Sequence, residues 1–235
     1  EGHTLVIRKA LYGLKSSGLR WHERFADVLR DMGFFPSKAE PDIWMKDMGD
    51  YYAYIGTYVD DLILSDKDPG KLIKALTERY KFKLKGTGPI SYHLGCDFIR
   101  DEKGRLCYMP RKYIEKMLDN YQRTFGSLPK MRKSPLEPND HPELDSSEEL
   151  DLEGIKIYQS LIGAMQWVIQ IGRWDITAHV ATLSRFRASP RQGHMDRVCR
   201  VYGYLRRYRH GINRIDTEEP DFSDLPKPSY DWSYS

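Results

Sequence analysis

Apolar positions recur at two different spacings along this chain. From Leu19 to Met32 they fall three or four residues apart, which predicts an amphipathic helix with Ser16 or Ser17 at its start and Gly33 at its end. Between residues 51 and 68 (YYAYIGTYVDDLILSDKD), two short apolar runs rich in aromatic and β-branched residues flank two adjacent aspartates. These runs predict two strands joined in a hairpin whose tip carries the aspartates.

In the rest of the chain, the pattern first predicts strands mixed with helices and then helices alone. Asp68 and Pro69 begin a second helix, with the aspartate as N-cap and the proline at the first helical position. Asp175 is the predicted N-cap of a helix in the C-terminal half. The other predicted strands are 43–48, 80–88, 90–100 and 106–109, and the other predicted helices are 110–121, 154–171, 175–187 and 191–210.

The overall composition adds little to the predicted fold, whereas the distribution of charge along the chain points to specific segments. The 235 residues are 40% hydrophobic and 30% charged with a net charge of +3, and no apolar run is long enough to cross a membrane. Residues 134–153 hold eight acidic residues and no lysine or arginine, and the proline-rich stretch 127–153 predicts a linker or surface excursion. Residues 185–214 hold nine arginines and one acidic residue. This second run predicts a surface that faces a polyanion, although a solvated helix face is the usual origin of such runs.

Asp60 and Asp61 are the candidate chemical site. Carboxylates between two apolar strands are costly unless a cation compensates their desolvation, and Mg²⁺ prefers such oxygen ligands while keeping positions open for phosphate. A solvated Asp-Asp turn is the alternative, and the preceding Tyr58 and Val59 together with the flanking strands favour the metal site. The three cysteines form no CxxC pair, so they predict reduced thiols rather than a zinc site.

The string Tyr58-Val59-Asp60-Asp61 resembles the active-site hairpin of reverse transcriptases. Further strings, in the same order along the chain, resemble the polymerase region of copia-type retrotransposons. Residues 11–15 (LYGLK) with Arg20-Trp21 are similar to that family's LYGLKQSPRxW segment, Leu94-Gly95 is similar to its primer-grip hairpin, and Tyr113-Ile114 is similar to the start of its next helix. Trp174-Asp175-Ile176 and residues 183–186 (LSRF) resemble the family's RPDI and LSRF strings. Tyr230-Asp231-Trp232 resembles the first strand of an RNase H domain.

The chain departs from the family pattern in three places. The glutamine and proline after LYGLK are Ser16 and Gly18, and the arginine-proline pair before Asp175 is Arg173-Trp174. In the family, the first catalytic aspartate lies on a strand upstream of LYGLK, and residues 1–11 contain none. The chain is therefore interpreted as a polyprotein fragment that lacks one of three catalytic carboxylates.

The resemblance implies an α+β fold in which a reverse-transcriptase palm, an antiparallel sheet with packed helices, is followed by a helical thumb and connection region. It assigns residues 1–109 to partial fingers and palm, residues 110–215 to the thumb and connection with the acidic linker 127–153, and residues 216–235 to the start of a truncated RNase H domain. The implied function is RNA-directed DNA polymerisation. The fragment alone is expected to bind nucleic acid without synthesis.

The implied mechanism is two-metal nucleotidyl transfer with two Mg²⁺ ions, or Mn²⁺ in their place. Asp60 is the expected principal metal ligand and Asp61 the secondary one, because successive strand residues point to opposite sides. Lys85 is implied as a general acid for the pyrophosphate leaving group, with an exposed strand lysine as the alternative. The implied nucleic-acid contacts are Gly13, Lys15, Tyr58, Leu94, Gly95, Arg197, Arg200, Arg206 and Arg207, and Asp231 is the implied first carboxylate of the RNase H domain.

The implied partners are an RNA template, a DNA primer, their hybrid, deoxynucleoside triphosphates, and the fingers, RNase H and integrase parts of a polyprotein, with no membrane. The resemblance places the chain inside cells, in a cytoplasmic virus-like particle or the nucleus. Two alternatives stay open: a non-catalytic nucleic-acid-binding remnant of a degenerate retroelement, and an unrelated magnesium phosphohydrolase. The second alternative needs more ligands near Asp60, whereas Asp66 and Asp68 lie at the far end of the second predicted strand.

Overall fold

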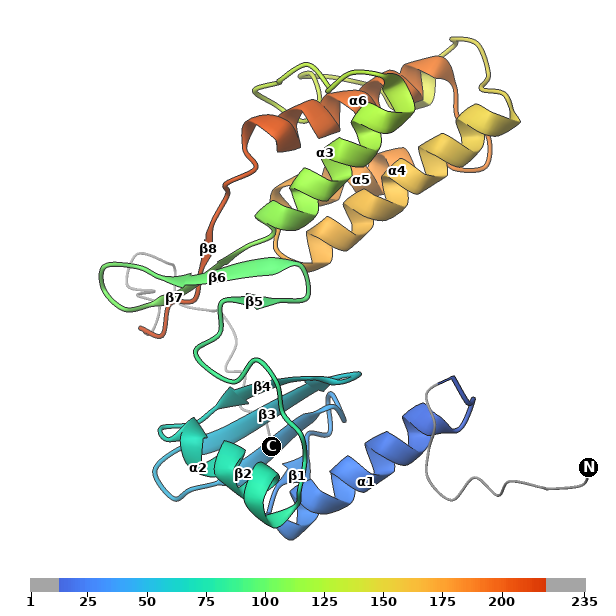
Figure 1. Ribbon diagram of the computed structural model, residues 1–235. Helices are drawn as coiled ribbons and strands as arrows, with labels where there is room; N and C mark the ends of the chain where they lie inside the picture. Colours follow the sequence, from blue (N-terminus) through green and yellow to red (C-terminus); the bar gives the residue numbers. More distant parts are fainter. Residues whose placement is uncertain (1–12, 219–235) are drawn as a thin grey trace, which may run out of the picture. The chain divides into compact units, whose positions relative to one another are not determined.

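The computed structural model describes residues 13–218, and the chain divides into two compact units, Glu1–Pro89 and Ile90–Ser235 (Figure 1). Each unit combines an antiparallel sheet with helices, so the prediction of an α+β chain is confirmed. In the part of the chain that the structure describes, no helix is both long and apolar enough to cross a membrane.

The first unit packs helices on one face of a four-stranded antiparallel sheet with the order β1-β2-β3-β4. Its core contains Phe25, Leu29, Trp44, Ile55 and Leu76, each at most 2% exposed. The other face of the sheet is open to solvent, because alternate residues of a strand point to opposite sides. The elements are α1 (Ser17–Asp31), β1 (Phe35–Pro36), β2 (Ile43–Asp47), β3 (Tyr52–Tyr58), β4 (Asp61–Ser65), α2 (Pro69–Lys74) and a π-helical turn (Ala75–Arg79).

The second unit joins a four-stranded antiparallel sheet to four packed helices (Figure 1). The helices bury Ile114, Tyr158, Met165, Leu183 and Tyr202 almost completely. The elements are β5 (Tyr92–His93), β6 (Cys96–Arg100), β7 (Leu106–Met109), α3 (Arg111–Phe125), a 3₁₀ turn (Pro142–Leu144), α4 (Leu152–Gln170), a second 3₁₀ turn (Trp174–Ile176), α5 (Thr177–Ser184), α6 (Gln192–Arg207) and β8 (Asn213–Arg214).

Two predicted strands are corrected by the structure. Residues 80–88 form no strand, because Lys81 has a positive φ of 61° and the segment pairs with no other in the described structure. Its alternating pattern arises because Phe82 and Leu84 pack against the core from an irregular loop. The predicted strand 90–100 is broken into β5 and β6 by a turn at Leu94 and Gly95, whose φ angles are 48° and 89°.

The helix predicted over residues 175–187 is also corrected. Asp175 is not its N-cap: Ile176 occupies that position, and α5 ends at Ser184. The Asp175 carboxylate instead accepts two hydrogen bonds from the buried Arg173 guanidinium, at 2.9 and 2.7 Å, and one from the Tyr204 hydroxyl. The Asp175 carboxylate therefore binds the buried Arg173 guanidinium instead of capping the backbone N–H groups of α5.

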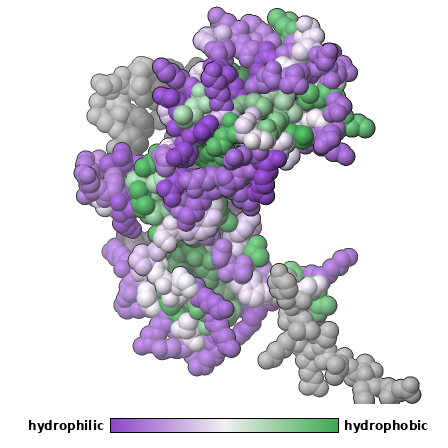
Figure 2. Space-filling view, turned by 45° about the horizontal axis from the view of Figure 1, so that its top comes forward, coloured by the Kyte–Doolittle hydropathy of each residue, from purple (hydrophilic) through white to green (hydrophobic). Residues whose placement is uncertain are grey.

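Residues 129–149, called the strap from here on, form the predicted surface excursion, and they are tied down along α6. Arg206 donates to the Pro129 carbonyl, the Arg132 N–H donates to the Gly203 carbonyl, and Arg191 donates to the Ser147 carbonyl. The strap therefore runs antiparallel to α6 along the whole helix. In the view of Figure 2, hydrophilic residues dominate the visible surface, with hydrophobic residues in smaller groups between them.

Candidate functional site

The aspartate hairpin forms as predicted. Tyr58 pairs with Asp61 as the last rung between β3 and β4, which leaves Val59 and Asp60 as a two-residue loop. The φ of Val59 is 56°, and Asp60 is not among the residues with positive φ, which is the pattern of a type II′ turn. Glycine usually occupies this position, and a β-branched residue there stores about 1–3 kcal/mol of backbone strain.

Both carboxylates at the hairpin tip are exposed to solvent. Among the described residues neither Asp60 nor Asp61 has a hydrogen-bond or ion-pair partner, unlike most acidic residues of the first unit. Two adjacent carboxylates without a cationic partner repel one another, and a divalent cation relieves this repulsion. Their hard oxygen donors fit Mg²⁺ or Mn²⁺ as two members of a ligand set.

The described residues do not complete such a ligand set. Over residues 13–218 there is no group of three or more His, Cys, Asp or Glu side chains that could hold a metal ion. Within that range β4 has a strand neighbour on one side, β3, and its other edge is unpaired. A further strand on that edge would lie directly beside Asp61.

The end of β3 next to the hairpin tip is attached to the start of β2 and to α1 through Asp42. The Asp42 carbonyl accepts from the Thr57 N–H at 2.9 Å and from the Thr57 hydroxyl at 3.1 Å. The Asp42 carboxylate lies 2.9 Å from the ring Nε2 of His22 on α1. These bonds hold the last residues of β3 before the tip, and the sequence signals for them are weak because the partners lie far apart in the chain.

The remaining predicted residues of the first unit lie in exposed segments. Gly13 has a φ of 92°, which a glycine tolerates, and no described atom lies near the position of an added Cβ. Lys15 and Lys85 are exposed and without an ion-pair partner among residues 13–218. Tyr58 is 48% exposed. The structure does not bring Lys85 and Asp60 into any described contact, so both assigned roles stay predictions.

In the second unit, Leu94 and Gly95 form the two-residue loop between β5 and β6. Both φ angles are positive, the pattern of a type I′ turn, which is unusual for leucine. An added Cβ on Gly95 would lie 3.6 Å from the side chains of Tyr113 and Ile171, so this turn packs on the helical part of the unit. Contact of this turn with a primer stays a prediction.

Three of the four predicted nucleic-acid-binding arginines on α6 have partners inside the chain. Arg197 donates from Nε and Nη2 to Asp140, at 2.8 to 3.0 Å, and from Nη1 to Asp145. Arg200 is paired with Glu137 and donates to the Ser134 hydroxyl, and Arg206 donates to a strap carbonyl. Arg207, the fourth, is exposed and lies over the ring of Tyr208 at 5.6 Å.

The electrostatics of the strap show that these pairs are strong. Burial by itself would raise the pKa of Asp145, but hydrogen bonds from Ser147 and Arg197 outweigh it and lower the pKa from 3.8 to about 2. Hydrogen bonds from Arg197 to Asp140 in turn raise the pKa of the Arg197 guanidinium. The side chains of Arg197, Asp140 and Asp145 are 20%, 15% and 8% exposed, so this network lies mostly away from water.

A buried histidine completes the attachment of the strap, and sequence reasoning assigned it no role. His194 is 3% exposed, accepts from the Arg191 N–H at Nδ1 and lies 2.9 Å from the Pro142 carbonyl at Nε2. An acidic run and an arginine run of similar length within one chain were the available signal. Opposite charge runs predict pairing with each other as well as with a partner.

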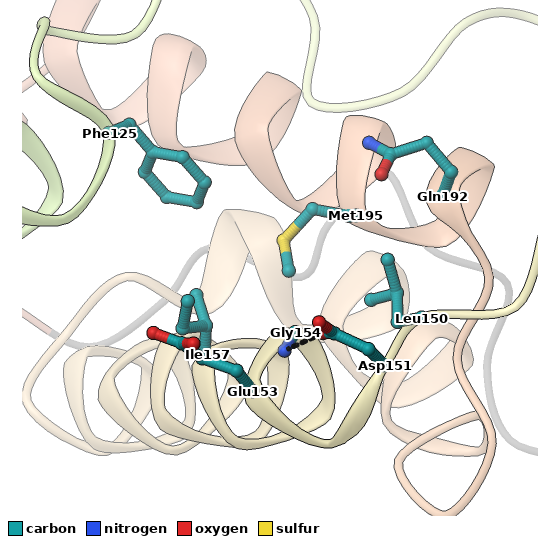
Figure 3. A pocket seen from close by; sticks show the side chains of 8 residues that line it. All are labelled: Phe125, Leu150, Asp151, Glu153, Gly154, Ile157, Gln192 and Met195. Carbon is teal, nitrogen blue, oxygen red and sulfur yellow. Dashed lines mark hydrogen bonds between the residues drawn. The ribbon is translucent and has the colours of Figure 1, made fainter.

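A shallow pocket of about 310 Å³ lies between the ends of α3, α4 and α6 (Figure 3). Asp151 on its rim accepts a hydrogen bond from the Gly154 N–H at 2.7 Å and so caps α4. No predicted site residue lines the pocket, and Asp231 lies outside the described residues. The lining residues are Phe125, Leu150, Asp151, Glu153, Gly154, Ile157, Gln192 and Met195.

Comparison with known proteins gives a consistent set of relatives. Residues 1–130 match the family model described as reverse transcriptase (RNA-dependent DNA polymerase). The chain is 30% identical over 199 residues to a putative transposon Ty5-1 protein of Saccharomyces cerevisiae, covering 83% of this chain and 62% of that protein. It is 30% identical over 200 residues to the retrovirus-related Pol polyprotein from transposon RE1 of Arabidopsis thaliana, covering 85% of this chain and 13% of that protein.

A third relative is the retrovirus-related Pol polyprotein from transposon TNT 1-94 of Nicotiana tabacum, which is 26% identical over 209 residues. That match covers 85% of this chain and 15% of the polyprotein. The chain thus spans about three fifths of one relative and a small part of the two polyproteins. No solved structure gives a significant match.

Proposed function

This chain belongs to the reverse transcriptase family of copia-type retrotransposon Pol polyproteins, and from that premise we propose that it carries part of an RNA-directed DNA polymerase site. The observation that carries the proposal is the pair Asp60 and Asp61 at the tip of a strained, exposed hairpin without a partner among the described residues. Strained turns are costly and cluster at functional sites, and two unpaired carboxylates side by side remain available for a cation.

In the proposed reaction, the 3′-hydroxyl of a DNA primer attacks the α-phosphorus of a deoxynucleoside triphosphate and gives up its proton to water. A new O–P bond forms, the bond from the α-phosphorus to the bridging oxygen breaks, and pyrophosphate leaves. Asp60 and Asp61 would hold divalent ions, which when bound supply charge stabilisation to the attacking and leaving oxygens. The hydrogen bonds that Thr57 donates to the Asp42 carbonyl keep the end of β3 in place, so the two carboxylates enter the site on a positioned scaffold. Lys85 is proposed to donate a proton to the leaving pyrophosphate.

A third carboxylate is proposed to come from a strand paired with the open edge of β4. The apolar residues Leu62, Ile63 and Leu64 of β4 are half-buried, and exposed apolar edge strands are avoided in soluble proteins. The family's upstream strand, which carries its first catalytic aspartate, would cover this edge beside Asp61. Two carboxylates from the hairpin tip and one from the added strand would fit a site that binds two metal ions.

The sheet β1–β4 with its helices is proposed as palm, with the boundaries 1–109 for partial fingers and palm, 110–215 for thumb and connection, and 216–235 for an RNase H start. Leu94 and Gly95 are proposed to hold the primer, and Gly13, Lys15 and Tyr58 to contact template or nucleotide. The proposed partners are an RNA template, a DNA primer, their hybrid, deoxynucleoside triphosphates and the rest of a polyprotein, within a virus-like particle or the nucleus.

Primer extension tests this proposal most directly. The chain, expressed within the longest open reading frame that encodes it, is given an RNA template, a DNA primer, deoxynucleoside triphosphates and Mg²⁺. Extension is expected, and it is expected to stop in Asp60→Asn and in the presence of a chelator. Asp47→Asn, a change of an exposed aspartate at the other end of the same sheet, serves as the matched control.

Direct metal binding gives a second readout that does not depend on synthesis. Titration with Mn²⁺, followed by its paramagnetic effect on water relaxation, is expected to show weaker binding in Asp60→Asn than in Asp47→Asn. Equal binding in both variants, together with full extension by Asp60→Asn, would rule out the aspartate hairpin as the metal site.

The second candidate function is nucleic-acid binding without synthesis. It is favoured by the lack of a third metal-ligating side chain near the pair over residues 13–218. The 235-residue chain by itself is then expected to bind an RNA–DNA hybrid without extending the primer. Efficient extension by these 235 residues alone would exclude this candidate.

A further inference from the structure

The charges on α6 fall into two groups with different surroundings. Toward its N-terminus, Arg191, Arg197 and Arg200 are each paired with a carboxylate of the strap. Toward its C-terminus, Arg206 and Arg207 have no carboxylate partner within the described chain. Strap acids at the helix N-terminus and arginines at the C-terminus also complement the helix dipole.

The beginning of the strap brings more positive charge to the same end of α6. The Arg132 N–H donates to the Gly203 carbonyl at 3.2 Å, and an added Cβ on Gly203 would overlap the Lys130 carbonyl oxygen. Arg206 and Arg207 follow Gly203 by three and four residues, so they lie on the same helix face one turn further on. The strap segment contacts Arg206, which donates to the Pro129 carbonyl at 2.8 Å, and Arg207 is the next residue of the helix.

The beginning of the strap and the adjoining C-terminal turn of α6 thus carry five cations, called the basic patch: Lys130, Arg132, Lys133, Arg206 and Arg207. Lys130, Lys133 and Arg207 are exposed, and none of the five is in an ion pair within residues 13–218. Met131 between them is 52% exposed, and Tyr208 is 41% exposed. Exposed aromatic side chains among unpaired cations are typical of surfaces that bind nucleic-acid backbones and bases.

We infer that the basic patch, rather than the whole arginine-bearing face of α6, is the polyanion contact of the second unit, and that its ligand is the phosphate backbone of an RNA–DNA hybrid. The identification of the polyanion as an RNA–DNA hybrid rests on the proposed function. The strap acids occupy the guanidinium groups of Arg197 and Arg200, so on the strap and α6 the five cations without a carboxylate partner are left for phosphates. Binding of this kind is independent of sequence and falls steeply with salt.

A salt titration of hybrid binding tests the inference. The 235-residue chain and the variant Lys130→Gln/Lys133→Gln/Arg207→Gln are titrated onto a fluorescent RNA–DNA hybrid of mixed sequence between 50 and about 200 mM salt. The slope of log K against log salt is expected to fall by about 1 for each lost phosphate contact, about 3 in all, and affinity at the lower salt to fall at least tenfold.

The matched control is Lys38→Gln/Lys103→Gln/Lys156→Gln, which removes the same charge from exposed lysines outside the basic patch. Thermal melts followed by circular dichroism show that each variant is folded. Equal slopes for the two triple variants overturn the inference, as does failure of the parent chain to bind hybrid. Arg197→Gln is expected to lower the melting temperature and leave the slope unchanged, and a lost slope in that variant would also contradict the basic patch.

The inference and the proposed function fail in different ways. Extension lost in Asp60→Asn with an unchanged slope in the patch variant would keep the polymerase proposal and reject the basic patch. A reduced slope in the patch variant, with no extension by the longer open reading frame, would keep the basic patch and reject the polymerase proposal.

Discussion

The hairpin of the first unit and helix α6 of the second treat their charges in opposite ways. Asp60 and Asp61 face solvent on a strained turn, with no described partner. Arg197 and Arg200 are held by carboxylates from a segment of the same chain about 60 residues earlier. The hairpin was predicted as functional from two adjacent aspartates between apolar strands, and α6 from a run of arginines.

The difference shows that charge alone does not identify a functional surface. A paired, mostly buried charge contributes to the folded state, and removal of one partner leaves the other uncompensated. An unpaired, exposed charge contributes little to folding and remains available for a ligand. Mutations at the hairpin are therefore expected to alter activity, and mutations under the strap to alter stability.

The largest effect is expected at the hairpin. Asp60→Asn in the longer open reading frame should lower the rate of primer extension by about a thousandfold, because it removes a metal ligand that contributes several kcal/mol to the transition state. The free energy of unfolding of the same variant should change by less than about 0.5 kcal/mol, because Asp60 has no described partner. A large loss of stability in Asp60→Asn would show that the hairpin charges, like the paired arginines of α6, stabilise the fold.

The next effect is expected under the strap. Arg197→Met leaves Asp140 and Asp145 unpaired in a mostly buried site, and should lower the free energy of unfolding by about 3 kcal/mol. Urea denaturation measures this change. Arg207→Met, on the same helix but exposed, is the control and should change stability by less than about 0.5 kcal/mol. Similar losses in both variants would show that pairing with the strap is not what stabilises α6.

The backbone contact between strap and helix should matter to a smaller degree. Gly203→Ala places a Cβ against the Lys130 carbonyl oxygen and should destabilise the protein by about 2 kcal/mol. Gly163→Ala on α4, where an added Cβ meets no described atom, should stabilise it by about 0.5–1 kcal/mol through helix propensity. Thermal denaturation of the two variants should therefore shift in opposite directions.

Acid should weaken the attachment of the strap to α6 in the second unit. The folded-state pKa of Asp145 lies below the ordinary value, so its contribution is fully present above about pH 4 and is lost as the pH falls toward about 2. This loss amounts to about 1 kcal/mol after screening by solvent. Asp145→Asn should flatten the pH dependence of the urea midpoint across that window, and an unchanged slope would contradict the assignment.

The smallest effect is expected at the hairpin turn. Val59→Gly removes a β-branched residue from positive φ, and the relieved strain of about 1–3 kcal/mol exceeds the entropic cost of glycine, about 1 kcal/mol. The melting temperature should therefore rise slightly. Val59→Ala retains a Cβ at the same φ and should gain less. A lower melting temperature in Val59→Gly would show that the turn is not strained.

Much of the fold followed from local pattern. The apolar stripe of α1 and that of α6 form helices within two or three residues of the predicted bounds, because an amphipathic period of 3.6 has one favourable solution. The aspartate hairpin formed as expected, because two β-rich runs separated by two residues favour a tight hairpin between them. By contrast, residues 80–88 alternate like a strand but have no partner, and pairing is a property of the sheet rather than of one segment.

The sequence by itself determined which residues carry charge, where the turns fall and which family the chain resembles. Only the tertiary structure decided which charges remain free, because the acids of the strap and the arginines of α6 lie tens of residues apart and meet through folding. Electrostatic energy depends on the distance between groups and on their burial, and neither can be read from position along the chain. The arginines toward the N-terminus of α6 therefore stabilise the fold by pairing with the strap, and those toward its C-terminus have no carboxylate partner in the described chain.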